Sequence, residues 1–146
     1  MNQKKEKAVT SFRSGLNCAQ AILMAYVDQL RYDNSLALVL SCGFGAGMGR
    51  LQETCGAVTG AFMTLGIYNC QKYTENKDRK EKTYAMIQEF NARFISIHKT
   101  TQCAELLKCD LKTPEGQEIF KKGNLTEKVC EKCIADSVDI LEEIMN

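Results

Sequence analysis

Cysteine is the residue type in this sequence that could carry out redox or metal chemistry. The chain has eight cysteines but one histidine, one proline and no tryptophan. Its first residues are positively charged without an apolar segment behind them, so we expect no signal peptide and a cytoplasmic location. Thiols stay reduced in a cytosol unless they bind a metal or take part in redox reactions. The cysteines are therefore either small core residues or parts of a functional site.

Four of the cysteines are predicted to lie at or near the start of a helix. Cys18 follows an asparagine and Cys55 follows a threonine, residue types that often cap helices. Cys103 and Cys130 come soon after Thr101 and Thr126, which could do the same. The free amide groups at a helix start stabilise a thiolate and lower its pKa. If the four helix starts converge, they form an electropositive pocket suited to a metal cluster or a nucleophilic thiolate.

This pattern allows three kinds of site. The favoured one is an iron–sulfur cluster of unspecified type, used in electron transfer and held by four thiolates, the usual number for small clusters. Its ligands would be Cys18, Cys55, Cys103 and Cys130. The second is a metal-free thiol–disulfide pair or redox sensor drawn from the same four residues. The third is structural zinc, although only one pair of its ligands has a usual zinc spacing. The zinc ligands would be Cys103, Cys109, Cys130 and Cys133.

The other residues of chemical interest are predicted to be structural. Cys42 and Cys70 are expected to be small buried hydrophobic residues. Cys133 is expected to be a core neighbour of Cys130, because a thioredoxin-like C-x-x-C motif needs a βαβ context that this sequence lacks. His98 is expected at the surface. The glycine-rich run 43–49 does not fit a nucleotide-binding motif, so its glycines are expected to allow close approach of the backbone.

The elements that position these residues are predicted to be helices. Apolar residues recur at three-to-four spacing, and no segment alternates as a strand would. We expect an all-α fold, with residues 1–146 forming a single compact bundle of about six to eight helices as one domain. A charged segment, 74–82, is expected to face water before the fifth helix. The helices are predicted at 4–12, 17–30, 33–42, 54–68, 83–98 and 101–107, and from 113 and 126 onward.

Two glycines in the fourth predicted helix suggest close packing. Gly56 and Gly60 lie one turn apart and give the helix a face of small residues. A glycine inside a helix costs about 1 kcal/mol relative to alanine. The pair is therefore predicted to let another helix approach closely.

The charge balance limits the partners that we expect. Lysine and arginine number 19 against 18 acidic residues, which does not favour a nucleic acid or an anionic membrane surface as partner. The longest apolar runs are too short and too rich in glycine for membrane insertion. We expect a redox partner protein of unknown identity and leave open a homodimer and an enzymatic activity.

The segments around the cysteines resemble a known family. They are FRSGLNCAQA at 12–21, CGAVTG at 55–60, CAELL at 103–107, and Cys130. Their order and rough spacing over nearly the whole chain are similar to the C-GCAxxG-C-C family of redox-active proteins. Here Cys-Gly-Ala stands where the family name spells Gly-Cys-Ala. The resemblance implies four characteristic cysteines, which are Cys18, Cys55, Cys103 and either Cys130 or Cys133.

A similar cysteine pattern occurs in split-Soret cytochromes, where it is associated with an iron–sulfur cluster. The present sequence has no C-x-x-C-H motif, so the resemblance excludes a c-type haem. It implies a redox function and leaves cluster and dithiol chemistry both open.

Overall fold

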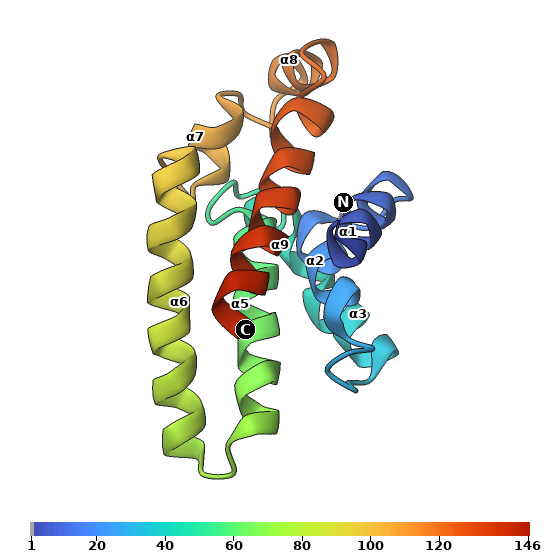
Figure 1. Cartoon of the computed structure of the whole chain (residues 1–146). Helices are drawn as coiled ribbons and strands as arrows, with labels where there is room; N and C mark the ends of the chain where they lie inside the picture. The colour runs from blue at the N-terminus through green and yellow to red at the C-terminus, as the bar shows by residue number, and fades with distance from the viewer. Residues whose placement is uncertain (1) are drawn as a thin grey trace.

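A computed structural model describes residues 2–146 and confirms the all-α fold (Figure 1). Within this range there is no β-strand, and the one isolated β-bridge joins Thr54 to Gln102. None of the helices described is both long and apolar enough to cross a membrane. The helices in chain order are α1 (Gln3–Arg13), α2 (Cys18–Tyr26), α3 (Asn34–Ser41), the 3₁₀ turn η1 (Cys42–Phe44), α4 (Gly45–Met48), α5 (Gly56–Lys72), α6 (Asn76–His98), α7 (Cys103–Leu107), α8 (Pro114–Lys122), the π-helical turn η2 (Thr126–Cys130) and α9 (Glu131–Met145).

The longest helices, α5 and α6, form an antiparallel hairpin (Figure 1). Helix α9 packs against both of them and also against α1, while α2 lies along α5. Helices α7 and α8 lie at the end of the bundle where α6 ends and α9 begins (Figure 1). Arg13 of α1 and Glu131 of α9 form an ion pair of 2.7 Å near this end. The fold thus brings helices from both halves of the chain together.

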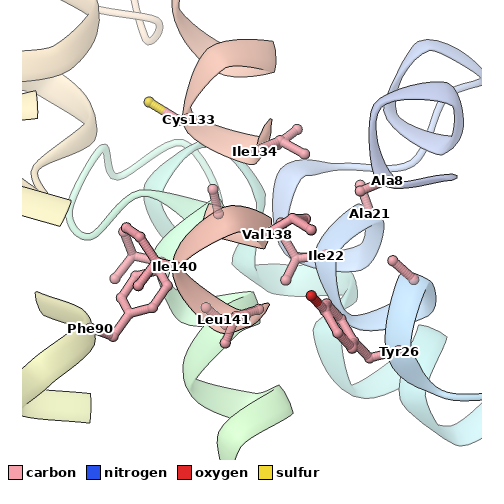
Figure 2. Packing of buried hydrophobic residues seen from close by; sticks show 14 of the residues in the cluster. Ala8, Ala21, Ile22, Tyr26, Phe90, Cys133, Ile134, Val138, Ile140 and Leu141 are labelled. Atoms are coloured by element: carbon pink, nitrogen blue, oxygen red, sulfur yellow. The ribbon is translucent and has the colours of Figure 1, made fainter. Parts of the chain in front are cut away.

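The core is built around the inner face of α9 (Figure 2). Ile134, Val138 and Leu141 are fully buried and recur at the spacing of one helical face. They pack in one cluster with Tyr26 of α2 and Phe90 of α6. This continuous apolar cluster holds α9 in place, and with it the cysteines at its beginning.

Helices α2 and α5 approach closely, as Gly56 and Gly60 predict. A Cβ atom on Gly60 would lie 2.7 Å from the carbonyl oxygen of Ala19. One on Gly56 would lie 2.8 Å from the Cβ atom of Cys18. Both distances are too short for real contacts, so glycine at these positions allows the helices to pack and brings Cys18 beside the start of α5.

Side-chain caps are present at Asn17 and at the helix starts predicted at 33 and 113, whereas the caps predicted at Thr54 and Thr101 are wrong, because the N-cap residues of α5 and α7 are Cys55 and Gln102 and neither forms a side-chain cap. Asn17 forms a reciprocal capping box with Gln20, Asp33 accepts a hydrogen bond of 2.7 Å from the amide of Leu36, and Thr113 caps the helix that begins with Pro114. The segment 74–82 faces water, as predicted, but its position before the helix is wrong, because α6 already begins at Asn76. Its charged residues include good helix formers, which extend the helix without contributing an apolar stripe.

Candidate functional site

A cavity of about 180 Å³ lies at the end of the bundle near α7 and α8. Five cysteines line it, and they are Cys18, Cys55, Cys103, Cys130 and Cys133. Most of its other lining residues are apolar, and none of those described carries a charged side chain. Large side chains close it on several sides, and they are Phe12, Leu106, Leu107, Leu111, Phe120 and Val129. The cavity therefore gathers thiols in an apolar setting.

Three of the cysteines lie at helix starts, as predicted. Cys18 is the first residue of α2, Cys55 is the N-cap of α5, and Cys103 is the first residue of α7. The bridge at Thr54 fixes the last two side by side. The amide of Cys55 donates to the carbonyl of Thr101 at 2.7 Å, and the amide of Cys103 donates to the carbonyl of Glu53 at 2.7 Å.

Cys130 lies near a helix start, as predicted, because it immediately precedes α9, but the predicted cap at Thr126 is wrong. Thr126 does not cap a helix, because residues 126–130 form the π-helical turn η2, which runs directly into α9. Cys130 ends this turn and Cys133 follows three residues later on the same side of the helix. Both cysteines therefore line the cavity. The sequence predicts Cys133 only as a core residue beside Cys130, but in the structure its side chain also forms part of the cavity wall. Figure 2 shows the sulfur of Cys133 directed away from Ile134 and the core.

The cavity thiols affect one another's pKa values in two pairs. Cys55 is paired in this way with Cys133, and Cys18 with Cys130. The hydrogen bond from Cys133 lowers the pKa of Cys55, and the amides of Ala57 and Val58 lower it further against the effect of burial. Cys55 therefore loses its proton more readily than Cys18, Cys103 and Cys133.

The other buried thiols hold their protons more tightly. The hydrogen bond to Cys130, together with burial, raises the pKa of Cys18. Burial raises the pKa of Cys103 to about 12. The hydrogen bond to Cys55 and burial raise the pKa of Cys133 well above the ordinary value for a thiol. A helix start alone therefore does not activate a thiol here, because the cost of burying a thiolate exceeds the benefit of the helix amides at Cys18 and Cys103.

Gln52 is a site residue that the sequence analysis missed. Its side chain is buried, and its amide nitrogen donates to the carbonyl of Cys109 at 2.8 Å while its oxygen accepts from the amide of Leu111 at 2.8 Å. Its side chain also hydrogen-bonds Cys103 and partly offsets the effect of burial on that thiol's pKa. A single glutamine in a loop gives no signal in the sequence that would distinguish this role.

The glycine-rich run follows an uncommon left-handed path beside the cavity. Residues Ala46 to Arg50 all have positive φ, between 53° and 68°. At Gly47 a Cβ atom would lie 2.5 Å from the Cα atom of Gln52 and 2.7 Å from the Cβ atom of Cys103. The expected close approach of backbone is thus found at this glycine. The non-glycine residues in this path each cost about 1–2 kcal/mol of strain, which the surrounding contacts must offset.

His98 is largely buried, and its prediction as a surface residue is wrong. Its side chain is 11% exposed, because the end of α6 packs against α9. Its ring stacks on Phe94, and its Nδ1 atom lies 4.0 Å from the sulfur of Cys133. Its Nε2 atom lies 2.9 Å from a carboxylate oxygen of Asp136, within ion-pair range but not aligned for a hydrogen bond. His98 therefore flanks the site through Cys133.

The remaining cysteines stay outside the cavity. Cys42 and Cys70 are exposed, so their prediction as core residues is wrong. Cys42 begins the turn η1 directly after α3, and Cys70 lies in the last turn of α5. Cys109 is half-buried and does not line the cavity, which separates it from the other proposed zinc ligands. In residues 2–146 no close group of three or more His, Cys, Asp or Glu side chains could bind a single metal ion.

Comparison with known proteins identifies the family of the chain. No curated protein and no solved structure matches it significantly. The family model described as "Putative redox-active protein (C_GCAxxG_C_C)" matches residues 16–144, a range that includes all five cysteines of the cavity. The chain therefore belongs to the C_GCAxxG_C_C family of redox-active proteins.

Proposed function

We propose that the cavity binds an iron–sulfur cluster through Cys18, Cys55, Cys103 and Cys130, and that the protein transfers electrons. The observation that carries this proposal is that five thiols from four segments of the chain surround one apolar cavity. Thiolate sulfur is the usual protein ligand of iron–sulfur clusters.

The size and chemistry of the cavity fit such a group. An apolar protein cavity of about 150 Å³ can hold a molecule the size of benzene, and this one measures about 180 Å³. The thiols surround a space rather than converging on one point, which suits a cluster of several metal atoms better than a single zinc ion. The raised pKa values of Cys18 and Cys103 do not oppose the proposal, because metal coordination removes a thiol proton outright.

We assign the fourth ligand to Cys130 rather than to Cys133. Cys130 lies within reach of Cys18 and is partly exposed, which gives the site one edge near solvent. Cys133 is almost fully buried, and its thiol has partners in Cys55 and His98. It would then act on the site through these contacts.

A bound cluster would supply a one-electron redox centre. The chain would set its environment. The amides of Ala57 and Val58 lower the pKa of the Cys55 thiol, and amides near a ligand sulfur favour the more negative, reduced state. The apolar side chains around the cavity, Phe12 and Phe120 among them, would keep water from the sulfur atoms.

A second candidate is metal-free thiol–disulfide chemistry, favoured by the contact between Cys55 and Cys133. Cys55 has the lowered pKa of an attacking thiolate, and Cys133 is close enough to act as the resolving thiol. In this reaction two thiols would form one disulfide and release two protons and two electrons to an oxidised disulfide partner.

Measuring the content of iron and acid-labile sulfide in protein purified without oxygen tests the proposal. We expect coloured protein, with iron and sulfide lost in Cys55→Ser because serine is a poor soft ligand. The matched control, Cys70→Ser at an exposed site, should keep both. Colourless protein without iron, even after reconstitution, would refute the cluster, and a disulfide between Cys55 and Cys133 in that protein would support the second candidate.

The pair Cys130→Ser and Cys133→Ser tests the fourth ligand. We expect Cys130→Ser to lose iron and Cys133→Ser to keep it. The reverse result would assign the fourth ligand to Cys133, one helical turn further along the chain.

A further inference from the structure

A second cleft, of about 870 Å³, opens on the outer side of the cysteine cavity. Ala46, Leu111 and Phe120 line both spaces, so one layer of apolar side chains separates them. The left-handed loop supplies one edge of the cleft and α8 supplies the other. Whatever binds in this cleft therefore lies directly behind the wall of the redox site.

The rim of this cleft is basic. Arg50, Lys121 and Lys122 line it with one carboxylate, that of Glu118. Glu118 pairs with Lys122 at 2.9 Å. Among the described residues no ion pair neutralises Arg50 or Lys121. The cleft thus carries a local positive charge on a molecule whose net charge is only +1.

Exposed apolar side chains stand beside these charges. Leu51 follows Arg50 and is 62% exposed, and Ile119 precedes Phe120 and is 55% exposed. An apolar centre with a charged rim is typical of protein interfaces. Charge on the rim steers a partner of opposite sign and speeds its association.

We propose that this cleft is the docking surface for an acidic redox partner protein, which exchanges electrons with the site through the shared wall. This inference rests on the proposed redox function of the cavity. The positive charge of the cleft favours an acidic partner. Because the cleft and the cavity share one wall, a partner docked there would lie close enough to the cysteine cavity to exchange electrons with it. One electron passes between the reduced site and an oxidised partner, and no bond forms or breaks.

Electron-transfer kinetics with small charged oxidants test the charge at this surface. The reduced protein is mixed with ferricyanide, an anion, and separately with tris(phenanthroline)cobalt(III), a cation, at low and high ionic strength. The quantity compared is the rate with ferricyanide divided by the rate with tris(phenanthroline)cobalt(III). We expect the double variant Arg50→Glu/Lys121→Glu to lower this ratio about tenfold at low ionic strength, which is at the low end of electrostatic steering effects. Salt should reduce the difference.

The matched control reverses two charges at the far end of the molecule. Lys77 and Lys80 are exposed on the first turns of α6, remote from α8 (Figure 1). The double variant Lys77→Glu/Lys80→Glu changes the net charge equally and should leave the ratio unchanged. Equal ratios in the two double variants would overturn the proposal.

A binding experiment separates this proposal from that of the cluster, because it needs no metal. A fluorescent oligoglutamate peptide is titrated into metal-free protein at low ionic strength, with anisotropy as the readout. We expect binding to be lost in the Arg50/Lys121 variant and kept in the Lys77/Lys80 variant. Equal binding in both would overturn the docking surface, and tighter binding of an oligonucleotide of equal charge would overturn the assignment to a protein. If the peptide binds as expected but the protein never retains iron, the cluster is refuted and the docking surface is not.

Discussion

Cys55 combines two features that the other thiols of the cavity do not share. The backbone amides of Ala57 and Val58 lower the pKa of its thiol, and so does the neighbouring thiol of Cys133. Cys18 and Cys103 also begin helices, but burial and neighbouring thiols raise their pKa values. The acidity of each thiol therefore depends on the sum of burial and specific donors, and position at a helix start is not sufficient.

The order of alkylation in metal-free protein should follow this difference. As pH rises, Cys55 should react with iodoacetamide at a lower pH than Cys103, because the pKa of Cys55 is lowered and that of Cys103 is raised to about 12. Mass-spectrometric mapping of the labelled peptides measures the extent of alkylation of each cysteine at each pH. In urea, where the fold is lost, the two should react alike. Equal pH profiles in the folded protein would show that burial cancels the effect of the donors at Cys55.

Tyr26 offers a second test at the scale of a single residue. Its hydroxyl is buried without a hydrogen-bond partner, and in Figure 2 it lies within the core cluster. Burial first, then Glu142 and Asp139, raise its pKa. The folded protein therefore keeps this proton when the unfolded chain releases it, and the stability present below about pH 10 is lost as pH rises further.

The variant Tyr26→Phe should match or exceed the stability of the wild type at neutral pH, by up to about 1 kcal/mol, because it removes an unpaired polar group. It should also lose less stability between neutral pH and about pH 10.5. Urea unfolding at several pH values measures both effects. Tyr32→Phe, at a partly exposed position, is the control and should retain the alkaline loss of the wild type. If Tyr26→Phe lost as much stability at alkaline pH as the wild type, Tyr26 would not be the source of that loss.

At the scale of elements, the loop 43–52 holds α7 against the start of α5. Gly47 lies against Gln52 and Cys103, and Gln52 in turn binds the backbone around Cys109 and Leu111. The bridge between Thr54 and Gln102 joins the same two segments. These contacts, rather than a regular element, set the positions of Cys55 and Cys103.

The variant Gly47→Ala should disturb this arrangement. A methyl group there would collide with the backbone of Gln52 and with Cys103, in a left-handed conformation that alanine adopts at a cost. We expect a loss of stability of about 1–3 kcal/mol and lower iron content after reconstitution. Gly43→Ala, in the same loop with open space around its Cβ position and ordinary φ, should have neither effect. Equal iron content in both variants would contradict the role of Gly47.

The helices and three of the site cysteines were predictable because their signals are local. Capping residues such as Asn17 and Asp33 mark helix starts within a few residues, and Cys18 directly follows Asn17. The bridge of Thr54 is too short to produce the alternation of a strand. The π-helical turn before Cys130 and the burial of His98 depend on packing against distant helices. Local patterns do not encode such contacts, so Cys133 and Gln52 could not be placed from the sequence.

For the whole molecule, the cysteine cavity and the core share one helix. The inner face of α9 fills the centre of the bundle through Val138 and Leu141, while its first turn and the residue before it bring Cys133 and Cys130 to the cavity. Any group bound by these cysteines together with Cys18 and Cys55 therefore links α2, α5 and α9. Such a group stabilises the folded state, because the unfolded chain does not hold its ligands together.

Cluster-loaded protein should consequently unfold at a higher temperature than metal-free protein. We expect a rise of at least about 5 °C, which corresponds to a few kcal/mol for a chain of this size. Anaerobic thermal unfolding followed by circular dichroism measures it. Cys70→Ser should show the same rise, whereas Cys55→Ser should show none. Identical unfolding temperatures for loaded and metal-free wild type would mean that the bound group does not connect these helices.

The order in which the cavity walls occur along the chain has a consequence for biosynthesis. Cys18 and Cys55 are made early, but Cys130 and the core face of α9 come from the last helix described. While that helix is still inside the ribosome, the earlier cysteines have no fourth wall and no core to hold them together. Delivery of the proposed cluster would therefore follow release of α9 from the ribosome, and a chain still being translated would be a poor acceptor.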